Sequence, residues 1–227
     1  LQAQGIRCGR KRVARLMRQA GLRGKCKGRR RICTTESKHK LPVAENVLQQ
    51  DFTAEQPNTK WVADITYIPT DEGWLYLAVV MDVFSRKVVG WAMDASMTSQ
   101  LVERALEAAL VTRQPPPGLL HHSDRGSQYA SHDYQARLQT VQAQVSMSRS
   151  GICYNNALMV SFCATLITDL VEVKPFASHA AARCDILLYI EGFYNLRRRH
   201  SALGYLSPVE FERRHSITLS APKAVGA

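Results

Sequence analysis

The sequence predicts an α/β fold: a mixed five-stranded sheet flanked by helices, with a small basic helical part at the N-terminus. From residue 60 onward, strand-like runs of β-branched and aromatic residues alternate with helical runs of 3.6-residue apolar period. The first three strand-like runs are joined by short turns, which predicts an antiparallel meander, whereas helices separate the later ones. At 227 residues the chain can form one substantial core plus a small appendage.

Five strands and four helices are expected in this main part. The strands are 61–68, 74–83, 87–93, 119–124 and 143–148, and the helices are 99–112, 131–138, 156–171 and 179–195. The second strand is an almost unbroken apolar run, which is typical of a central strand. Trp61, Trp74 and Trp91 are expected to be core aromatics.

Positive charge is concentrated at the N-terminus. Residues 1–40 hold 14 of the 30 Lys and Arg but one of the 19 Asp and Glu, a net of +13 in a chain whose total is +11. Such a block either adds solubility or binds nucleic acid, and its concentration on a helix favours nucleic acid.

Residues 9–20 predict the helix that carries part of this charge, with Gly21 as its C-terminal stop. Its apolar residues share the spacing of one buried stripe: Val13, Leu16, Met17 and Ala20. A short basic helix can enter a DNA groove as the last helix of a helix-turn-helix. Since no partner helix precedes it, we expect residues 1–40 to be a truncated helix-turn-helix with a basic segment, followed by a linker at 41–59.

The composition argues against several classes of protein. No apolar run approaches the roughly 20 residues of a membrane helix, so a membrane is not an expected partner. The six cysteines show neither CxxC nor a paired His spacing, which argues against a zinc site. Scattered reduced thiols are typical of a cytoplasmic protein.

Two aspartates stand in strand-like runs. Asp64 shares a strand face with Val62 and Thr66, and Asp124 follows an apolar start and precedes a strand-breaking Arg-Gly-Ser. Burying a carboxylate is costly unless it is paired or binds a metal. One such Asp is often structural, but two favour a divalent-metal site. For His121 and His122, a packed, hydrogen-bonded role is favoured over metal binding.

At these residues the chain resembles the bacterial insertion-sequence transposases with a retroviral-integrase-like core. Within them it is most similar to the second-frame product of the family made from two overlapping reading frames. Six motifs carry the resemblance and cover nearly the whole chain: 61–67, 82–86, 122–129, 146–149, 194–195 with 199–201, and 203–208.

The resemblance implies a ribonuclease-H-like integrase core at 60–215, a tail at 216–227, and phosphodiester chemistry with two Mg²⁺ ions, Mn²⁺ being an alternative. In that family two Asp and one Glu hold the metals. Asp64 and Asp124 match the two aspartates. The Glu position, separated from the second Asp by 35 residues, is Val160.

Val160 cannot bind a metal, and two further departures lie near it. Asn155 stands where an acid is usual, and Ile167 where the family commonly has a basic DNA-contacting residue. Asp169 and Glu172 are turned away from the metal side of the predicted helix.

Asn156 shares the metal side of that helix, but a neutral amide is a weak ligand for a hard cation. We therefore expect a protein that folds and binds DNA but is catalytically impaired. Residual activity is expected if Asp64 and Asp124 hold one Mg²⁺ between them.

The expected partner is double-stranded DNA, at the element ends and at the target, bound by a homo-oligomer by analogy with transposases that pair two ends. Basic residues expected to contact DNA are Arg10, Lys11, Arg12, Arg15, Arg18, Arg29, Arg30, Arg31, Arg125, Arg197, Arg199 and His200. Arg125 could equally solvate a turn, and the basic residues at 197–200 could form a charged helix end.

Three functions remain open at this point. The first is a transposase that cuts and joins element ends. The second is a DNA-binding or inhibitory remnant without catalysis, which the substitution at Val160 favours. The third is a nuclease of the same fold that acts on RNA–DNA hybrids, against which the basic N-terminal helix argues mildly.

Overall fold

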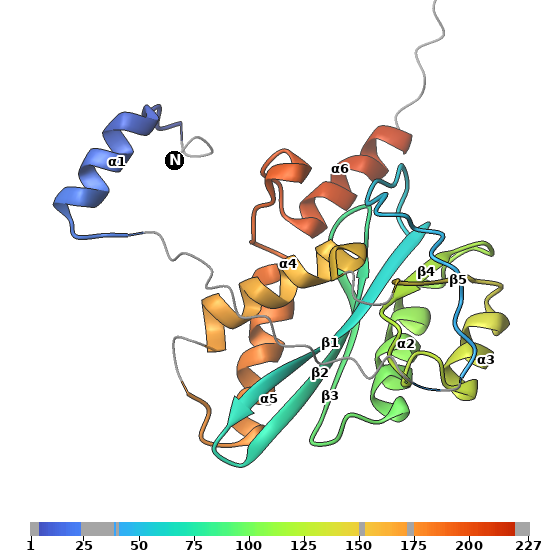
Figure 1. Ribbon diagram of the computed structural model, residues 1–227. Helices are drawn as coiled ribbons and strands as arrows, with labels where there is room; N and C mark the ends of the chain where they lie inside the picture. Colours follow the sequence, from blue (N-terminus) through green and yellow to red (C-terminus); the bar gives the residue numbers. More distant parts are fainter. Residues whose placement is uncertain (1–4, 24–38, 40, 150–152, 172–174, 221–227) are drawn as a thin grey trace, which may run out of the picture. The chain divides into compact units, whose positions relative to one another are not determined.

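The computed structural model describes residues 5–23, 39, 41–149, 153–171 and 175–220 (Figure 1). The chain divides into two compact units, Leu1–Ile32 and Cys33–Ala227. Within the described residues, no helix is long and apolar enough to cross a membrane.

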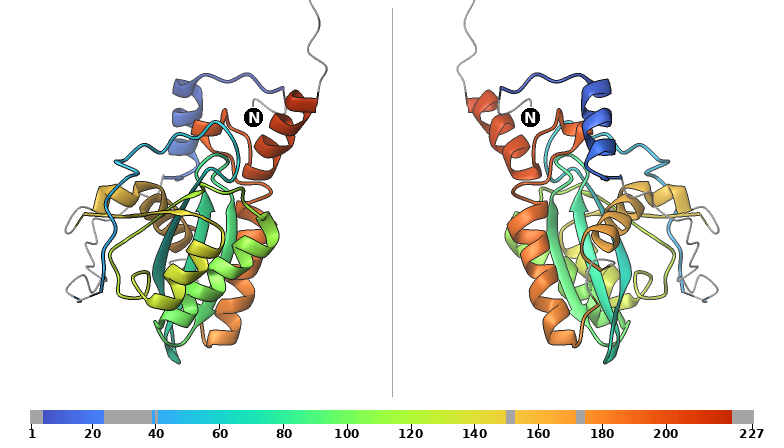
Figure 2. Two further views of the ribbon diagram at one scale, coloured as in Figure 1. Left: turned by 90° about the vertical axis from the view of Figure 1, so that its right-hand side faces the viewer. Right: turned by 90° about the vertical axis from the view of Figure 1, so that its left-hand side faces the viewer.

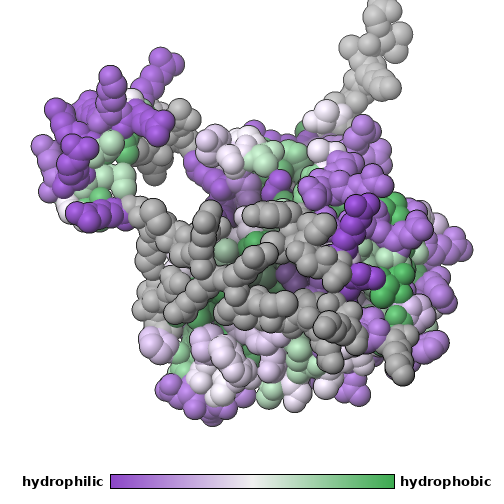
Figure 3. Space-filling view, viewed as in Figure 1, coloured by the Kyte–Doolittle hydropathy of each residue, from purple (hydrophilic) through white to green (hydrophobic). Residues whose placement is uncertain are grey.

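The N-terminal unit contains one helix in its described part, α1 (Arg10–Gln19). Gly21 follows with a φ of +65°, a conformation that suits glycine at the end of a helix. The helix and its C-terminal stop are as predicted. The prediction that its apolar stripe is buried is wrong, because no residue of α1 is buried and Leu16 is 50% exposed. Nothing in residues 5–23 could cover the stripe, which shows as a small apolar strip among hydrophilic side chains in Figure 3.

The second unit is built on the predicted five-stranded mixed sheet. Its strands are β1 (Lys60–Thr70), β2 (Gly73–Asp82), β3 (Val88–Asp94), β4 (Leu120–Ser123) and β5 (Gln144–Met147). They are ordered β3-β2-β1-β4-β5 (Figure 1). β1, β2 and β3 form the expected antiparallel meander, and β4 and β5 add in parallel on the other side of β1.

Helices cover both faces of this sheet (Figure 2). α2 (Ser99–Arg113) and α3 (His132–Thr140) pack on the face that holds Trp61 and Ala63. α4 (Ala157–Leu166) and α5 (His179–Leu187) pack on the face that holds Val62. The strict alternation along β1 therefore assigns neighbouring residues to two separate cores, as the period-2 pattern predicted.

Close packing of α2 on the sheet depends on a glycine. A Cβ at Gly90 on β3 would collide with the carbonyl oxygen of Ala105 and the backbone nitrogen of Ala109, both on α2. Gly90 has no side chain to hold the helix away, so small residues of α2 reach the backbone of the strand.

Several boundaries differ from the sequence expectation. The two last predicted helices each change from α to π geometry, at Ile167–Val171 (η3) and Leu188–Tyr194 (η4). Trp61 is buried as expected, but Trp74 is 54% exposed because it lies at the start of β2, beyond the helices. Trp91 is partly buried and donates its indole N–H to Glu191 at 2.8 Å.

The segment 41–59 is not a free linker. Leu48 is 2% exposed and belongs to the core beneath α4. The backbone N–H groups of Val47 and Leu48 both donate to the Ser146 hydroxyl, at 2.9 and 3.1 Å. The sequence did not indicate these contacts, because the apolar residues that anchor this segment are isolated and do not recur at a helix or strand spacing.

A helix that the sequence analysis missed, α6 (Pro208–Ser220), ends the described chain and crosses the expected boundary at 215. Its start has a recognisable signal, since Ser207 accepts the Glu210 N–H at 3.3 Å and proline is the first helical residue.

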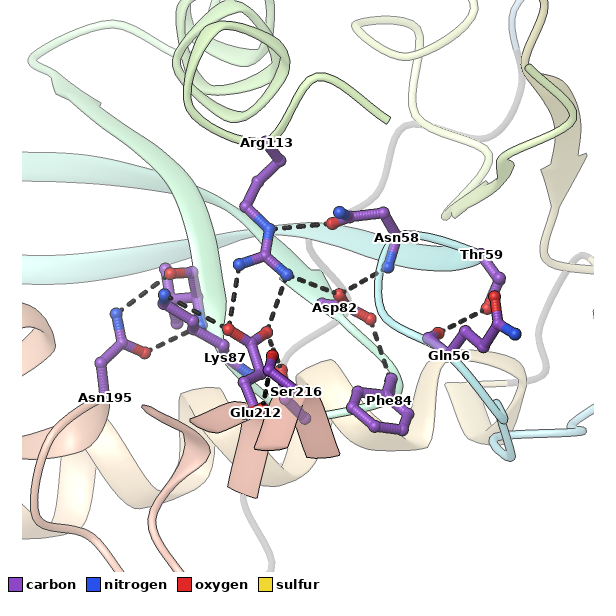
Figure 4. A network of polar contacts seen from close by, with 12 residues as sticks. Gln56, Asn58, Thr59, Asp82, Phe84, Lys87, Arg113, Asn195, Glu212 and Ser216 are labelled. Carbon is purple, nitrogen blue, oxygen red and sulfur yellow. Dashed lines mark hydrogen bonds and ion pairs between the residues drawn. The ribbon is translucent and has the colours of Figure 1, made fainter. Parts of the chain in front are cut away.

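A largely buried ionic network connects α6 to the end of β2 (Figure 4). The Arg113 guanidinium, on α2, donates to both Glu212 carboxylate oxygens, at 3.0 and 2.7 Å, and to Asp82 at 3.2 Å. Ser85 also donates to Glu212, at 2.8 Å. Asp82 is fully buried, and this burial raises its pKa to about 6 despite the nearby cation. The network joins α2, α6 and the β2–β3 turn.

Candidate active site

The sheet register brings the two aspartates together. β1 and β4 are adjacent and parallel, with Val62 opposite His122. Asp64 and Asp124 each lie two residues further along, so their carboxylates leave neighbouring strands at the same level. Each keeps part of its surface open to solvent.

The electrostatics show that these carboxylates interact. Burial and then the negative charge of Asp124 raise the pKa of Asp64 well above that of an ordinary aspartate. The Ile65 N–H, which donates to Asp64 Oδ1 at 2.9 Å, opposes this only in part. A pair of crowded carboxylates is stable when it shares a proton or binds a cation, and hard divalent cations prefer such oxygens.

The turn after Asp124 is shaped for this carboxylate. The Gly126 N–H donates to Asp124 Oδ1 at 2.9 Å. A Cβ on Gly126 would lie 3.0 Å from that oxygen and 2.9 Å from Gln128 Oε1. A side chain here would crowd the Asp124 carboxylate, and glycine leaves room for its hydrogen bond to the turn.

The N-terminal end of α4 covers Asp64. Asn156 donates its amide N–H to the Ala63 carbonyl at 2.9 Å, next to Asp64. One heptad on, Cys163 interacts with Thr66, and its thiol pKa is raised by burial and then by the Asp64 charge. Val160 lies four residues after Asn156 and three residues before Cys163, so it shares their face of the helix.

Val160 is 47% exposed at this position. A longer acidic side chain would have room there, but valine offers no oxygen. Among the described residues, no group of three His, Cys, Asp or Glu could hold a metal ion. Asn156 Oδ1, four residues before Val160, is buried without a hydrogen-bond partner among the described residues. Asp169 instead accepts from Arg198 and Tyr189, and Glu172 lies outside the described residues.

An open groove of about 510 Å³ includes Arg125, the residue that follows Asp124, in its lining. Its walls are residues 43–46 and Gln49, Arg125, and the end of β5 with Ser148 and Arg149. The Nε of Arg125 is buried without a hydrogen-bond partner among the described residues, while His39 holds its backbone carbonyl at 2.8 Å. The lining holds two arginines and one acid, Glu45, and this excess of positive charge suits the phosphates of a polyanion.

The two histidines before Asp124 have the structural role that was predicted. His122 is hydrogen-bonded to the hydroxyls of Ser146 and Ser148, at 2.8 and 3.1 Å. His121 is hydrogen-bonded to the Tyr134 hydroxyl at 3.0 Å. Burial lowers the pKa of His121 to about 3 and that of His122 to about 4, so both are neutral at pH 7.

The other predicted DNA-contacting residues lie in different places. All five on α1 are exposed: Arg10, Lys11, Arg12, Arg15 and Arg18. Arg29, Arg30 and Arg31 lie outside the described residues. Arg197 and Arg199 are exposed after η4, whereas His200 is half-buried. Sequence reasoning did not single out Arg149, which lines the groove; its only signal was its position at the end of a recognised motif.

Comparison with known proteins decides the family. Residues 54–153 and 141–208 match two integrase core domain families, and residues 1–30 match an HTH-like domain. The chain is 47% identical to transposase InsF for insertion sequence IS3A of Escherichia coli K12, over 95% of this chain and 74% of that protein. It belongs to the insertion-sequence transposases with an integrase core.

A 31 kDa protein of insertion element IS600 from Shigella sonnei is equally similar, at 47% identity over 95% of this transposase and 79% of that protein. Among solved structures, the HTLV-2 integrase catalytic core domain in complex with magnesium aligns with a TM-score of 0.55 and 17% identity, over 70% of this chain and 99% of that one. A simian T-cell lymphotropic virus intasome chain aligns with a TM-score of 0.59 and 16% identity, over 85% and 63%. The transposase therefore has the ribonuclease-H-like fold of retroviral integrase cores.

Proposed function

We infer that this transposase holds a divalent cation, Mg²⁺ or Mn²⁺, between Asp64 and Asp124, and that Val160 leaves it impaired in cutting and joining DNA. The observation that carries the proposal is the convergence of two carboxylates on neighbouring strands, where burial and then the negative charge of Asp124 raise the pKa of Asp64. A divalent cation in such a site activates an attacking oxygen and stabilises the leaving one during phosphodiester displacement. The magnesium bound by the HTLV-2 integrase core supports this choice of cation.

The residues around the pair would bind and position DNA. Arg125 and Arg149 line the open groove and would bind backbone phosphates there. The Gly126 turn and the Ile65 N–H hold the two carboxylates in place. Val160 puts an apolar surface where a third carboxylate would complete the ligand set, so the expected defect is in the chemical step rather than in DNA binding.

We expect double-stranded DNA as the partner, through the basic HTH-like residues 1–30 as well as the core, and a homo-oligomer on the paired ends. A DNA-binding protein without catalysis is the second candidate, because the described residues contain no three-member metal-binding group. Binding with a steep salt dependence but no nicking in Mg²⁺ or Mn²⁺ would select it.

The deciding experiment compares the parent with Val160→Glu and with the uncharged control Val160→Gln. End-labelled duplex carrying the terminal repeats of the element is incubated with Mg²⁺, and strand cleavage and joining are measured. We expect the Glu variant to exceed the parent by at least about a hundredfold, since a single well-placed catalytic group contributes about 10²–10⁴-fold. The Gln variant should stay at the parent level.

Three outcomes would change the proposal. Parent activity equal to that of Val160→Glu would show that the site is not impaired. Inactivity of all three proteins with intact DNA binding would favour the non-catalytic candidate. Cleavage of an RNA–DNA hybrid without strand joining would point to a nuclease. Magnesium binding, measured by calorimetry on the parent and on Asp64→Asn, checks the metal site separately from activity.

A further inference from the structure

A small cavity lies on the side of α4 away from the carboxylate pair. It measures about 40 Å³, and its polar lining comes from the β2–β3 turn (Arg86), α4 (Ser161 and Thr165), η4 (Tyr194) and the chain after η4 (Arg198 and His200). Since a water needs about 10–15 Å³ of such volume, the cavity holds roughly three waters or one group of similar size.

Positive charge in this cavity is not fully compensated. Arg86 is half-buried, burial lowers its pKa, and no carboxylate in the described part of the chain lies within ion-pair distance of it. Arg198 has one carboxylate partner, Asp169, at 2.9 Å. Burial, followed by the charges of Arg198 and Arg86, lowers the pKa of His200 to about 4. Of the two guanidinium groups, Arg198 thus has a carboxylate partner among the described residues and Arg86 has none, and both influence the His200 imidazole.

The lining is also rich in hydrogen-bond donors. The Nε2 of His200 is buried without a hydrogen-bond partner among the described residues. Arg198 Nη2 contacts the Thr165 hydroxyl at 3.5 Å, and the Ser161 hydroxyl is exposed beside it. Guanidinium, hydroxyl and imidazole groups around a space of this size match a tetrahedral oxyanion.

The backbone at Arg86 supports a ligand-binding role. Its φ is +59°, the left-handed region that a long side chain adopts only at a cost. The preceding residue, Ser85, is fully buried and is held by Glu212 at 2.8 Å. The turn is therefore anchored by its neighbours while it directs an unpaired arginine into the cavity. Strain maintained in this way is typical of functional positions.

We propose that Arg86, Arg198 and His200, with the hydroxyl of Ser161, form a site for one backbone phosphate of the bound DNA. The proposal rests on the DNA substrate inferred above. Leu158 and Thr165, which line the cavity, lie about 140–160° around α4 from Val160. The phosphate would therefore lie on a different side of α4 from the carboxylate pair, and would belong to a neighbouring nucleotide rather than to the one that reacts.

The test measures the affinity of the full chain for element-end duplex between 50 and 200 mM salt. The variants are Arg86→Gln, which removes the unpaired charge, and Ser161→Asp, which places a carboxylate at the cavity. The control is Arg137→Gln, which removes an exposed arginine paired with Glu107. Since Arg86 has no ion-pair partner in the described chain, Arg86→Gln should leave Tm unchanged or higher.

The loss of one phosphate contact lowers the salt slope by about 0.9, so the ratio of affinities at 50 and 200 mM salt should shrink by about threefold for both cavity variants. The control should match the parent. If Arg86→Gln and Ser161→Asp bind like the parent while the parent binds DNA normally, the phosphate site is refuted and the proposed function stands.

A second arm uses inorganic phosphate and follows the His200 ring by NMR. Bound phosphate should raise the pKa of His200 in the parent but not in Arg86→Gln, because an anion offsets the nearby guanidinium charge. If the parent fails to bind DNA but shows this phosphate response, the site takes free phosphate, and both the proposed function and the DNA-phosphate proposal are refuted.

Discussion

Removing Arg113 should destabilise the core unit strongly and in a pH-dependent way. The substitution Arg113→Met replaces the guanidinium with an apolar chain of similar length. Glu212 loses the two hydrogen bonds from Arg113. It keeps the hydrogen bond from the Ser85 hydroxyl and the ion pair with the more distant Lys87, at 3.5 Å. Asp82, fully buried, keeps the backbone N–H groups of Asn58 and Phe84 as its hydrogen-bond donors within the described part of the chain.

The expected cost at pH 7 is about 3–5 kcal/mol, the usual result of removing one partner from a buried ion network. The sign of the pH dependence follows from Asp82. The pKa of Asp82 is about 6 in the folded protein, above the unfolded value of 3.8. Ionised Asp82 therefore destabilises the folded state at pH 7, and its protonation removes this cost as the pH falls. Without Arg113 this pKa rises further, so the cost of the substitution should be smaller at pH 5 than at pH 7.

Urea unfolding of the full chain at both pH values, followed by tryptophan fluorescence, measures these differences, and hydrogen exchange in α6 reports local detachment. Arg137→Met is the control, because its pair with Glu107 is exposed on both sides and should contribute less than about 1 kcal/mol. A loss below about 1 kcal/mol at pH 7, or an equal loss at both pH values, would refute the reasoning.

Two further substitutions test the carboxylate pair and the packing of α2. Asp124→Asn should lower the pKa of Asp64 and stabilise the metal-free protein above pH 7 by on the order of 1 kcal/mol, because a charge that disfavours ionised Asp64 is removed. Added Mg²⁺ should then raise the Tm of the parent but not that of the variant, and a Tm gain in both would argue against Asp124 as a ligand. Gly90→Ala should cost about 1–3 kcal/mol in urea unfolding, since the added Cβ would collide with the backbone of α2. Gly192→Ala, which has open space around its Cβ position, should change stability by less than about 1 kcal/mol, and an equal cost at both sites would contradict the close-packing argument.

Local pattern determined the sheet and the carboxylate pair. Strand alternation depends on the two-residue period of the backbone, so the sequence alone assigned Asp64 and Val62 to one face of β1 and Trp61 and Ala63 to the other. The strand-breaking turn after Asp124 likewise marked the end of β4. Motifs, rather than periodicity, pointed to Val160 as the position that lacks an acid.

Tertiary contacts decided which other residues are buried and which polar groups meet. These contacts join residues that are distant in sequence, and the local sequence around each of them does not predict the contact. Leu48 is buried in a segment without a period, and Trp74 is exposed within an apolar run. The cavity brings Arg86 to residues more than 70 positions later in the chain, and the Arg113 network joins an α2 residue to a helix 99 positions away. Burial and charge balance at such sites depend on which elements meet in space, which no local pattern records.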